Sequence, residues 1–289
     1  VLSLQHPGGD SPVMKVKPSA KLGLICGAGR LPLYLAEALA QKGYEPLAIA
    51  PEGKPEPGLE KYVRSVHTFK FARLAQLLEL LENQGIKQLI FAGKFEKKWL
   101  YEPGTELDDL ARSLLVQLPD LKDDTIMNAV VGELEQRGFE VKGTLDFVQE
   151  WLAPLGVLGA HHPQPQEEKD IEFGFQLAKE IGRLGIGQTV AVLNQAVLAV
   201  EAIEGTDLTI LRAGQFTAGA VIVKVLRPGQ SLRYDLPVVG RSTIQSMIQA
   251  RARVLAVEAE RCLVVEKEEM LQLADENEIV IIGVRDGRG

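Results

Sequence analysis

Short apolar runs alternate with amphipathic segments through the first half of the chain. The pattern predicts a buried strand over 21–26, then a glycine turn and a helix that ends at Gly43. A strand over 46–50, a helix over 71–83 and a strand over 89–93 are expected to follow. Strands that alternate with helices pair in parallel and are covered on both faces. We therefore predict a doubly wound α/β domain with an open parallel sheet.

Two further helices, over 107–117 and 123–137, precede a stretch rich in proline and glycine between 151 and 166. Such a break in the pattern is typical of a domain boundary. The division that we predict is a loose leader over 1–20, an N-terminal domain over 21–155, a linker at about 156–164, and a C-terminal catalytic domain over 165–289.

The second region begins with a helix predicted over 167–183. After it, the apolar pattern predicts strands at 189–193, 197–202, 218–226 and 261–265, with helices at 242–251 and 267–276. We expect a distinct α/β domain, whose topology this pattern does not specify.

Composition agrees with two folded domains, because 289 residues with 46% hydrophobic and 25% charged positions are ordinary for globular proteins. A net charge of −7 argues against a nucleic-acid partner. The two cysteines, Cys26 and Cys262, lie in apolar surroundings and are expected to be buried thiols in a reducing cytoplasm. No apolar run is long enough to span a membrane.

Acidic residues at the ends of predicted elements are the first candidates for chemistry. Glu201, Glu204 and Asp207 follow an apolar run, and Asp235 follows later in the motif YDLP. Hard cations such as Mg²⁺ take oxygen ligands and share them with substrate phosphates, so these acids suggest a metal and phosphate site. The alternative is that they are solvated faces or helix caps.

The turn GAGRLP follows the first predicted strand and resembles a loop that holds a phosphate. It is an incomplete dinucleotide motif, because Gly27 and Gly29 are present but Pro32 takes the third glycine position. A nicotinamide-dependent oxidoreductase remains an alternative on this turn alone. Two other readings stay open. Asp123 and Asp124 either cap a surface helix or face a cleft, and Lys224 either faces solvent or points at a phosphate.

Seven motifs, taken in their order and spacing, resemble those of a known family: KLGLICGAGRLP, FAGK, KDDT, RLGIGQTVAV, VLAVEAIEGTD, VIVK and YDLPVVG. The chain resembles the LpxI-type UDP-2,3-diacylglucosamine pyrophosphatases of lipid A biosynthesis. The resemblance implies a Mg²⁺-dependent hydrolysis to UMP and 2,3-diacylglucosamine 1-phosphate (lipid X), in which water attacks the α-phosphorus. It also implies a Rossmann-like domain, a distinct C-terminal domain, and a lipid product bound between them.

Carried over to this sequence, the resemblance places the essential aspartate at Asp235. It also covers the glycine turns (Gly27, Gly29 and Gly93) and the EGTD motif (Glu204, Gly205, Thr206 and Asp207). Our own interpretation adds Arg30, Leu31, Lys94, Gln188 and Lys224 as substrate-binding residues, with Arg233 as a further phosphate partner.

For the metal we expect Asp235, Glu204 and Asp207 as ligands. An ordinary aspartate pKa of about 3.9 makes Asp235 a weak base but a good ligand for Mg²⁺, so metal binding is favoured over proton transfer. The main alternative function is a non-catalytic regulator that binds a nucleotide or lipid in the same cleft. We expect a cytoplasmic protein in peripheral contact with the inner membrane, with acyl chains held in an apolar cleft between the domains. The sequence does not exclude a homo-oligomer.

Overall fold

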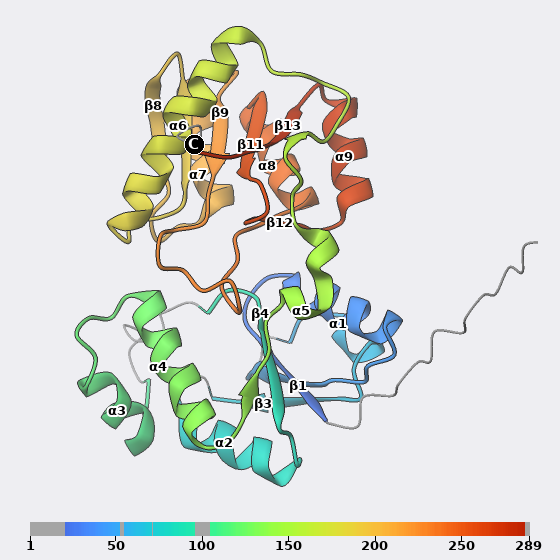
Figure 1. Ribbon diagram of the computed structural model, residues 1–289, viewed down its shortest axis with the longest axis vertical. Helices are drawn as coiled ribbons and strands as arrows, with labels where there is room; N and C mark the ends of the chain where they lie inside the picture. Colours follow the sequence, from blue (N-terminus) through green and yellow to red (C-terminus); the bar gives the residue numbers. More distant parts are fainter. Residues whose placement is uncertain (1–20, 53–54, 71, 96–104, 287–289) are drawn as a thin grey trace, which may run out of the picture.

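The computed structural model describes residues 21–52, 55–70, 72–95 and 105–286. These residues form two α/β domains, one above the other in Figure 1, which meet along a narrow waist. The leader predicted over 1–20 lies outside the described residues.

The N-terminal domain contains a five-stranded parallel sheet in the order β3-β2-β1-β4-β5. Its strands are β1 (Leu22–Cys26), β2 (Leu47–Pro51), β3 (Ser65–Phe69), β4 (Gln88–Ala92) and β5 (Glu140–Val141). The order of strands reverses between β1 and β4, and ligands in open α/β sheets bind beyond the carboxyl ends of strands at such a point. The predicted Rossmann-like architecture is confirmed.

Helices cover both faces of this sheet. One face packs against α1 (Leu31–Gln41) and α5 (Leu145–Val148), and the other against α2 (Leu74–Asn83), α3 (Asp109–Val116) and α4 (Asp123–Gln136). Alternation along β1 explains this, because Leu24 joins the first core and Ile25 joins the second. Short 3-10 turns occupy Leu59–Lys61 and Gln149–Trp151.

The C-terminal domain contains a six-stranded mixed sheet in the order β6-β13-β11-β9-β7-β8. Its strands are β6 (Gly156–Val157), β7 (Thr189–Leu193), β8 (Ala196–Val200), β9 (Val221–Lys224), β11 (Val254–Glu258) and β13 (Val280–Val284). The central strands β9, β11 and β13 are parallel, whereas β6, β7 and β8 pair antiparallel. A separate pair joins β10 (Val238–Val239) to β12 (Leu263–Val264).

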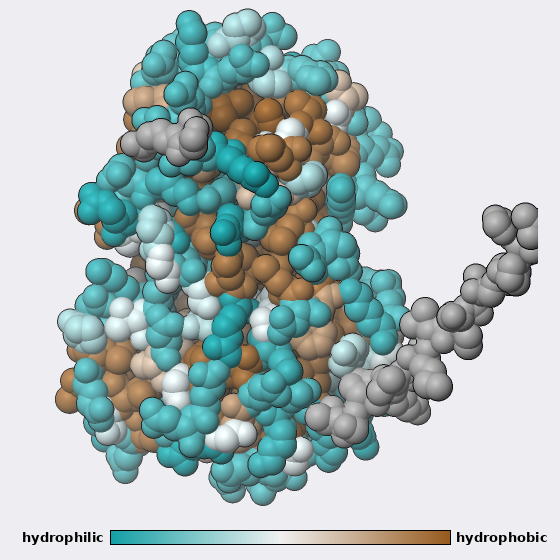
Figure 2. All heavy atoms as spheres, viewed as in Figure 1, coloured by the Kyte–Doolittle hydropathy of each residue, from teal (hydrophilic) through white to brown (hydrophobic). Residues whose placement is uncertain are grey.

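Four helices enclose the second sheet. The long α6 (Pro165–Arg183) covers one face, and α7 (Thr206–Gly214), α8 (Arg241–Ala250) and α9 (Lys267–Glu276) cover the other. No helix in the described part of the chain is long and apolar enough to cross a membrane. On the face drawn in Figure 2, apolar residues gather in the C-terminal domain and at the waist.

The sequence prediction lacks three five-residue strands, β3, β11 and β13, and three two-residue strands, β5, β6 and β10. The β3 sequence SVHTF holds only one buried residue, Phe69, so it carries no apolar run. The apolar β11 and β13 each lie close to an amphipathic helix, and periodicity alone does not separate a short strand from such a neighbour. Within the expected linker, β6 pairs with β13 and belongs to the C-terminal sheet.

Candidate active site at the domain boundary

The two glycine turns of the N-terminal domain pack backbone against backbone. Gly27 N donates to the carbonyl oxygen of Ala92 at 2.7 Å, and Ala28 and Lys94 exchange two backbone hydrogen bonds of 2.8 Å each. A Cβ on Gly27 would lie 2.7 Å from the Lys94 carbonyl oxygen, and a Cβ on Gly93 would lie 2.8 Å from that of Ala28. The glycines therefore fix the carboxyl ends of β1 and β4 side by side, at the point where the strand order reverses.

Replacing Gly27 with alanine is expected to destabilise the N-terminal domain by about 1–3 kcal/mol, because the methyl group would overlap the backbone of β4's turn. Urea denaturation measures the change in the free energy of unfolding. Gly132→Ala is the matched control, since a Cβ there meets no atom within 4 Å and alanine favours the helix by about 1 kcal/mol. Equal stability of the two variants would contradict the tight turn.

Arg30 and Leu31 lie where the first turn enters α1. Leu31 is the first helical residue, and Arg30 precedes it as the N-terminal capping position. The Arg30 guanidinium lies 3.8 Å from the Glu56 carboxylate and 3.5 Å from Glu266, which belongs to the C-terminal domain. Arg30 therefore faces the boundary between the domains, as a substrate-binding residue of a shared cleft would.

The N-terminus of α7 also faces this boundary. Gly205 precedes the helix at φ 85°, and no side chain of its own caps the helix. A Cβ on Gly205 would lie 3.4 Å from Lys94 Nζ of the opposite domain. The free backbone N–H groups and positive dipole of a helix start attract anions, and a lysine across the boundary adds charge of the same sign.

Thr206, Lys224 and Glu201 form a buried polar cluster beneath that helix start. Lys224 Nζ donates to Thr206 Oγ1 at 2.9 Å and to the Val238 carbonyl oxygen at 2.8 Å, and Thr206 Oγ1 donates to Glu201 Oε1 at 3.1 Å. Lys224 is only 6% exposed, so its solvent-facing alternative is wrong. Its strand lies inside a sheet covered by helices on both faces, which leaves no outward face for the charge.

Gln188 lines the same cluster through its backbone. Gln188 N donates to Glu201 Oε2 at 3.2 Å, and its carbonyl oxygen accepts from Val225 N at 3.0 Å. Its side-chain Oε1 is buried and has no hydrogen-bond partner within the described part of the chain. A buried acceptor without a partner is unfavourable unless a ligand supplies a donor.

Glu204 and Asp207 occupy different environments, although both belong to the EGTD motif. Glu204 Oε1 pairs with Arg212 at 2.6 Å and Oε2 accepts from Ala202 N at 3.1 Å. Burial works to raise the pKa of Glu204, but these hydrogen bonds outweigh it and the pKa is lowered. Burial raises the pKa of Asp207, Lys224 opposes the rise, and the charge of Glu201 adds to it. Glu204 is therefore held by contacts with Arg212 and Ala202, whereas Asp207, in the first turn of α7, is influenced by the charges of Lys224 and Glu201.

Asp235 lies in a second cluster, which joins the two domains. Arg227 Nη2 donates to Asp235 Oδ2 at 2.9 Å and to Asp124 Oδ1 of α4 at 2.8 Å. The Arg227 side chain is 14% exposed, while Asp124 and Asp235 are 32% and 37% exposed. One guanidinium thus holds two carboxylates from opposite domains close together.

The surroundings raise the pKa of Asp235 to about 6. Burial is the largest cause, Arg227 and Gln230 oppose it, and the neighbouring Asp124 adds repulsion. The ordinary aspartate pKa assumed from sequence therefore does not apply to this residue, and proton transfer near neutral pH becomes feasible for it.

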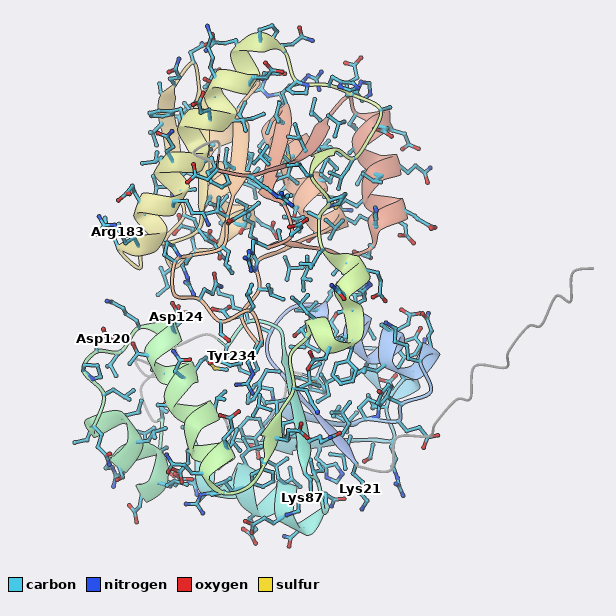
Figure 3. All side chains as sticks on the ribbon, viewed as in Figure 1. Lys21, Lys87, Asp120, Asp124, Arg183 and Tyr234 are labelled. Carbon is cyan, nitrogen blue, oxygen red and sulfur yellow. The ribbon has the colours of Figure 1, made fainter. Side chains whose placement is uncertain are left out.

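The loop over 226–237 brings Asp235 to the N-terminal domain. Thr144 N donates to the Arg233 carbonyl oxygen at 2.8 Å, and the Arg233 guanidinium contacts Glu135 at 2.7 Å. Tyr234 donates to Asn128 of α4 and packs against the Phe91 ring. Figure 3 shows Tyr234 beside α4, with Asp124 at the end of that helix nearest the C-terminal domain. The Arg233 side chain is therefore engaged in domain docking.

The three predicted metal ligands do not come together. Across residues 21–52, 55–70, 72–95 and 105–286, no three His, Cys, Asp or Glu side chains are grouped so that they could hold a metal ion. The donor set at Asp124 and Asp235 nevertheless fits Mg²⁺, which commonly takes one or two protein carboxylates and completes its shell with water and substrate phosphate. The Mg²⁺ requirement stays a prediction, but the carboxylate beside Asp235 is Asp124, which the expected set of Asp235, Glu204 and Asp207 did not contain.

Sequence reasoning missed Arg227 and left the position of Asp124 open. The structure places Asp124 beside Asp235, which favours the cleft-facing alternative over a surface cap for that residue. The available signal for Arg227 was its position three residues after Lys224, just beyond the carboxyl end of β9.

Two family models match the chain. The model described as the LpxI N-terminal domain matches residues 21–151, and the model described as the LpxI C-terminal domain matches residues 154–282. The UDP-2,3-diacylglucosamine pyrophosphatase LpxI of Caulobacter vibrioides is 32% identical over 279 residues, which cover 91% of this chain and 97% of that protein.

Similarity to solved structures is weak. N5-carboxyaminoimidazole ribonucleotide synthetase from Thermotoga maritima matches with a TM-score of 0.27 and 15% identity, over 63% of this chain and 41% of its own. The Cj0485 dehydrogenase matches with a TM-score of 0.29 and 12% identity, over 85% and 71% of the two chains. Likeness at this level carries no functional argument.

Proposed function

Because this chain belongs to the LpxI family, we propose that it hydrolyses the pyrophosphate of UDP-2,3-diacylglucosamine in lipid A biosynthesis. The products are UMP and 2,3-diacylglucosamine 1-phosphate, and water attacks the α-phosphorus. The observation that carries the proposal is the meeting of Asp235 and Asp124 through Arg227, at the boundary between two domains that both match the family.

In this proposal Asp235 is the catalytic carboxylate. Its pKa of about 6 leaves it mostly ionised at neutral pH and able to orient the attacking water and accept its proton. Asp124 and Asp235 would also hold the Mg²⁺ that the family requires, and the ion would supply positive charge to offset that of the pyrophosphate. Arg227 keeps the two carboxylates at one position before substrate binds.

The N-terminus of α7 is the proposed subsite for a substrate phosphate. Gly205 and Thr206 offer backbone N–H groups, and Lys94 and Lys224 place positive charge on either side of the helix start. The unpartnered oxygen of Gln188 is a ready acceptor for a substrate donor. Gly29 leaves room for a ligand to approach the backbone of the first turn, because a Cβ there would meet no atom within 4 Å, and Arg30 and Leu31 lie beside it at the start of α1. Gly27 and Gly93 contribute by holding this turn against the turn that follows β4.

The acyl chains of this substrate imply peripheral contact with the inner membrane surface, which is part of the proposal. Incubation with UDP-2,3-diacylglucosamine and Mg²⁺ in ¹⁸O-labelled water tests the reaction, and the label is expected in UMP. Label in the lipid product would overturn attack at the α-phosphorus. Tight substrate binding without Mg²⁺-dependent hydrolysis would favour the non-catalytic regulator instead.

A further inference from the structure

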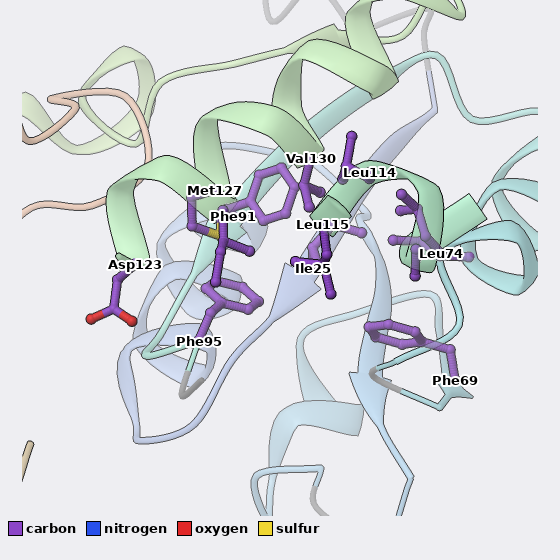
Figure 4. A pocket seen from close by; sticks show the side chains of 13 residues that line it. Ile25, Phe69, Leu74, Phe91, Phe95, Leu114, Leu115, Asp123, Met127 and Val130 are labelled. Atoms are coloured by element: carbon purple, nitrogen blue, oxygen red, sulfur yellow. The ribbon is translucent and has the colours of Figure 1, made fainter. Parts of the chain in front are cut away.

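An apolar cavity lies inside the N-terminal domain, between the sheet and the helices α2, α3 and α4 (Figure 4). Twelve of its thirteen described lining residues are apolar, and Asp123 is the exception. Its volume of about 80 Å³ is several times the roughly 10–15 Å³ that a water molecule requires. Water also needs two or more polar partners, and among the described lining residues only Asp123 has a polar side chain, so the cavity suits an apolar occupant.

The shape of the cavity follows from helical periodicity. Asp123, Ile126, Met127 and Val130 occupy one face of α4 at helical spacing, so the acidic residue stands at one end of an apolar stripe. In Figure 4 the labelled side chains extend from Asp123 at one end to Leu74 and Phe69 at the other. A space with so apolar a lining fits a hydrocarbon chain better than a sugar, a base or a phosphate.

The acidic end of the cavity adjoins the candidate active site. Asp123 is followed directly by Asp124, whose carboxylate is tied through Arg227 to Asp235. A substrate with its pyrophosphate at Asp235 would therefore have an apolar space within its own length. This adjacency of Asp123 and Asp124 at the start of α4, together with the apolar lining, points to the substrate's own hydrocarbon as the occupant.

We propose that this cavity receives the distal part of one acyl chain of the substrate. The inference rests on the proposed function and replaces the expectation that the acyl chains lie only between the domains. The carbohydrate would remain at the domain boundary, while the chain passes the start of α4 and enters between α3 and α4. The cavity then sets the chain length that the protein accepts.

Val130→Phe and Ala111→Leu narrow the cavity from α4 and α3. We expect kcat/KM for the dimyristoyl substrate to fall by roughly tenfold or more, as occurs when a methylene-sized space is lost, and that for the diacetyl analogue to stay unchanged. Val116→Phe is the matched control, because Val116 lies on α3 with 80% of its surface exposed. Equal losses on both substrates, or none on either, would overturn the cavity's role.

A cross-linking experiment separates this inference from the proposed function. A substrate with a diazirine at the end of its acyl chain is hydrolysed with and without irradiation, and labelled peptides are identified by mass spectrometry. Labels within α3 or α4 support the cavity, and labels confined to other segments overturn it even when the wild type hydrolyses the probe. Labels within α3 or α4 on a protein that does not hydrolyse the probe would support the cavity and reject the enzyme.

Discussion

Asp235→Asn is expected to lower kcat/KM for UDP-2,3-diacylglucosamine by at least about 10³-fold, because it removes the carboxylate that we assign to water and Mg²⁺. The amide keeps the shape of the side chain, so the fold is expected to persist. In the wild type, kcat/KM should decrease as pH falls through about 6, since protonation of the raised-pKa carboxyl removes its charge. A steady-state assay across pH measures both effects.

Asp109→Asn is the control for this variant, because its carboxylate is fully exposed on α3 and pairs with Arg112 at the surface. It should leave activity unchanged.

A stability measurement adds an independent check on Asp235. When folding raises the pKa of a carboxyl, the folded protein loses stability as the pH rises from the unfolded to the folded pKa of that group. Asparagine does not titrate, so the free energy of unfolding of Asp235→Asn, relative to that of the wild type, should be higher at about pH 8 than at about pH 4. If Asp235→Asn retained hydrolysis, another residue would be the catalytic one.

Arg227→Met is expected to decrease kcat/KM by about 10²-fold and to lower the free energy of unfolding by about 2 kcal/mol. The variant leaves Asp124 and Asp235 facing each other without the guanidinium that now contacts both. Because Arg227 opposes the rise of the Asp235 pKa, its loss should raise that pKa further and shift the acidic limb of the pH profile upward. Activity assays across pH and denaturation curves measure the changes.

The matched control is Arg183→Met, which removes an exposed pair with Glu180 inside α6. Exposed pairs of this kind contribute about 0–1 kcal/mol, so both stability and activity should change little. Arg227→Lys separates charge from geometry, because lysine keeps the positive charge but lacks the planar guanidinium with its several N–H donors. An unmoved acidic limb in Arg227→Met would mean that another group governs the pH dependence.

The N-terminal sheet was the easiest part of the fold to predict. Its strands β1, β2 and β4 are apolar runs that are buried on both faces, so the sequence shows each as an uninterrupted block. The two-residue strands β5 and β6 leave no pattern, because two residues do not establish a period. Their pairing is decided by tertiary contacts instead.

The candidate site was only partly predictable for a similar reason. The family resemblance pointed to Asp235, and motifs identified Thr206 and Lys224 individually, because these two lie at the start of α7 and the end of β9. The partnership of Arg227 with Asp124 spans 103 positions, and nothing local to either residue signals the other. Burial of Lys224 was likewise undecidable, because alternation assigns it a face of the strand but does not say what covers that face.

The docked loop over 226–237 has a consequence for how this protein can be divided. It follows β9 of the C-terminal sheet, but its residues contact α4, Thr144 and Phe91 of the N-terminal domain. Neither half therefore contains the full set of groups that we propose for catalysis, even though each has its own hydrophobic core. Separately produced halves would be inert apart, and any restored turnover on mixing would report reassembly of the pair, much as in split reporter proteins.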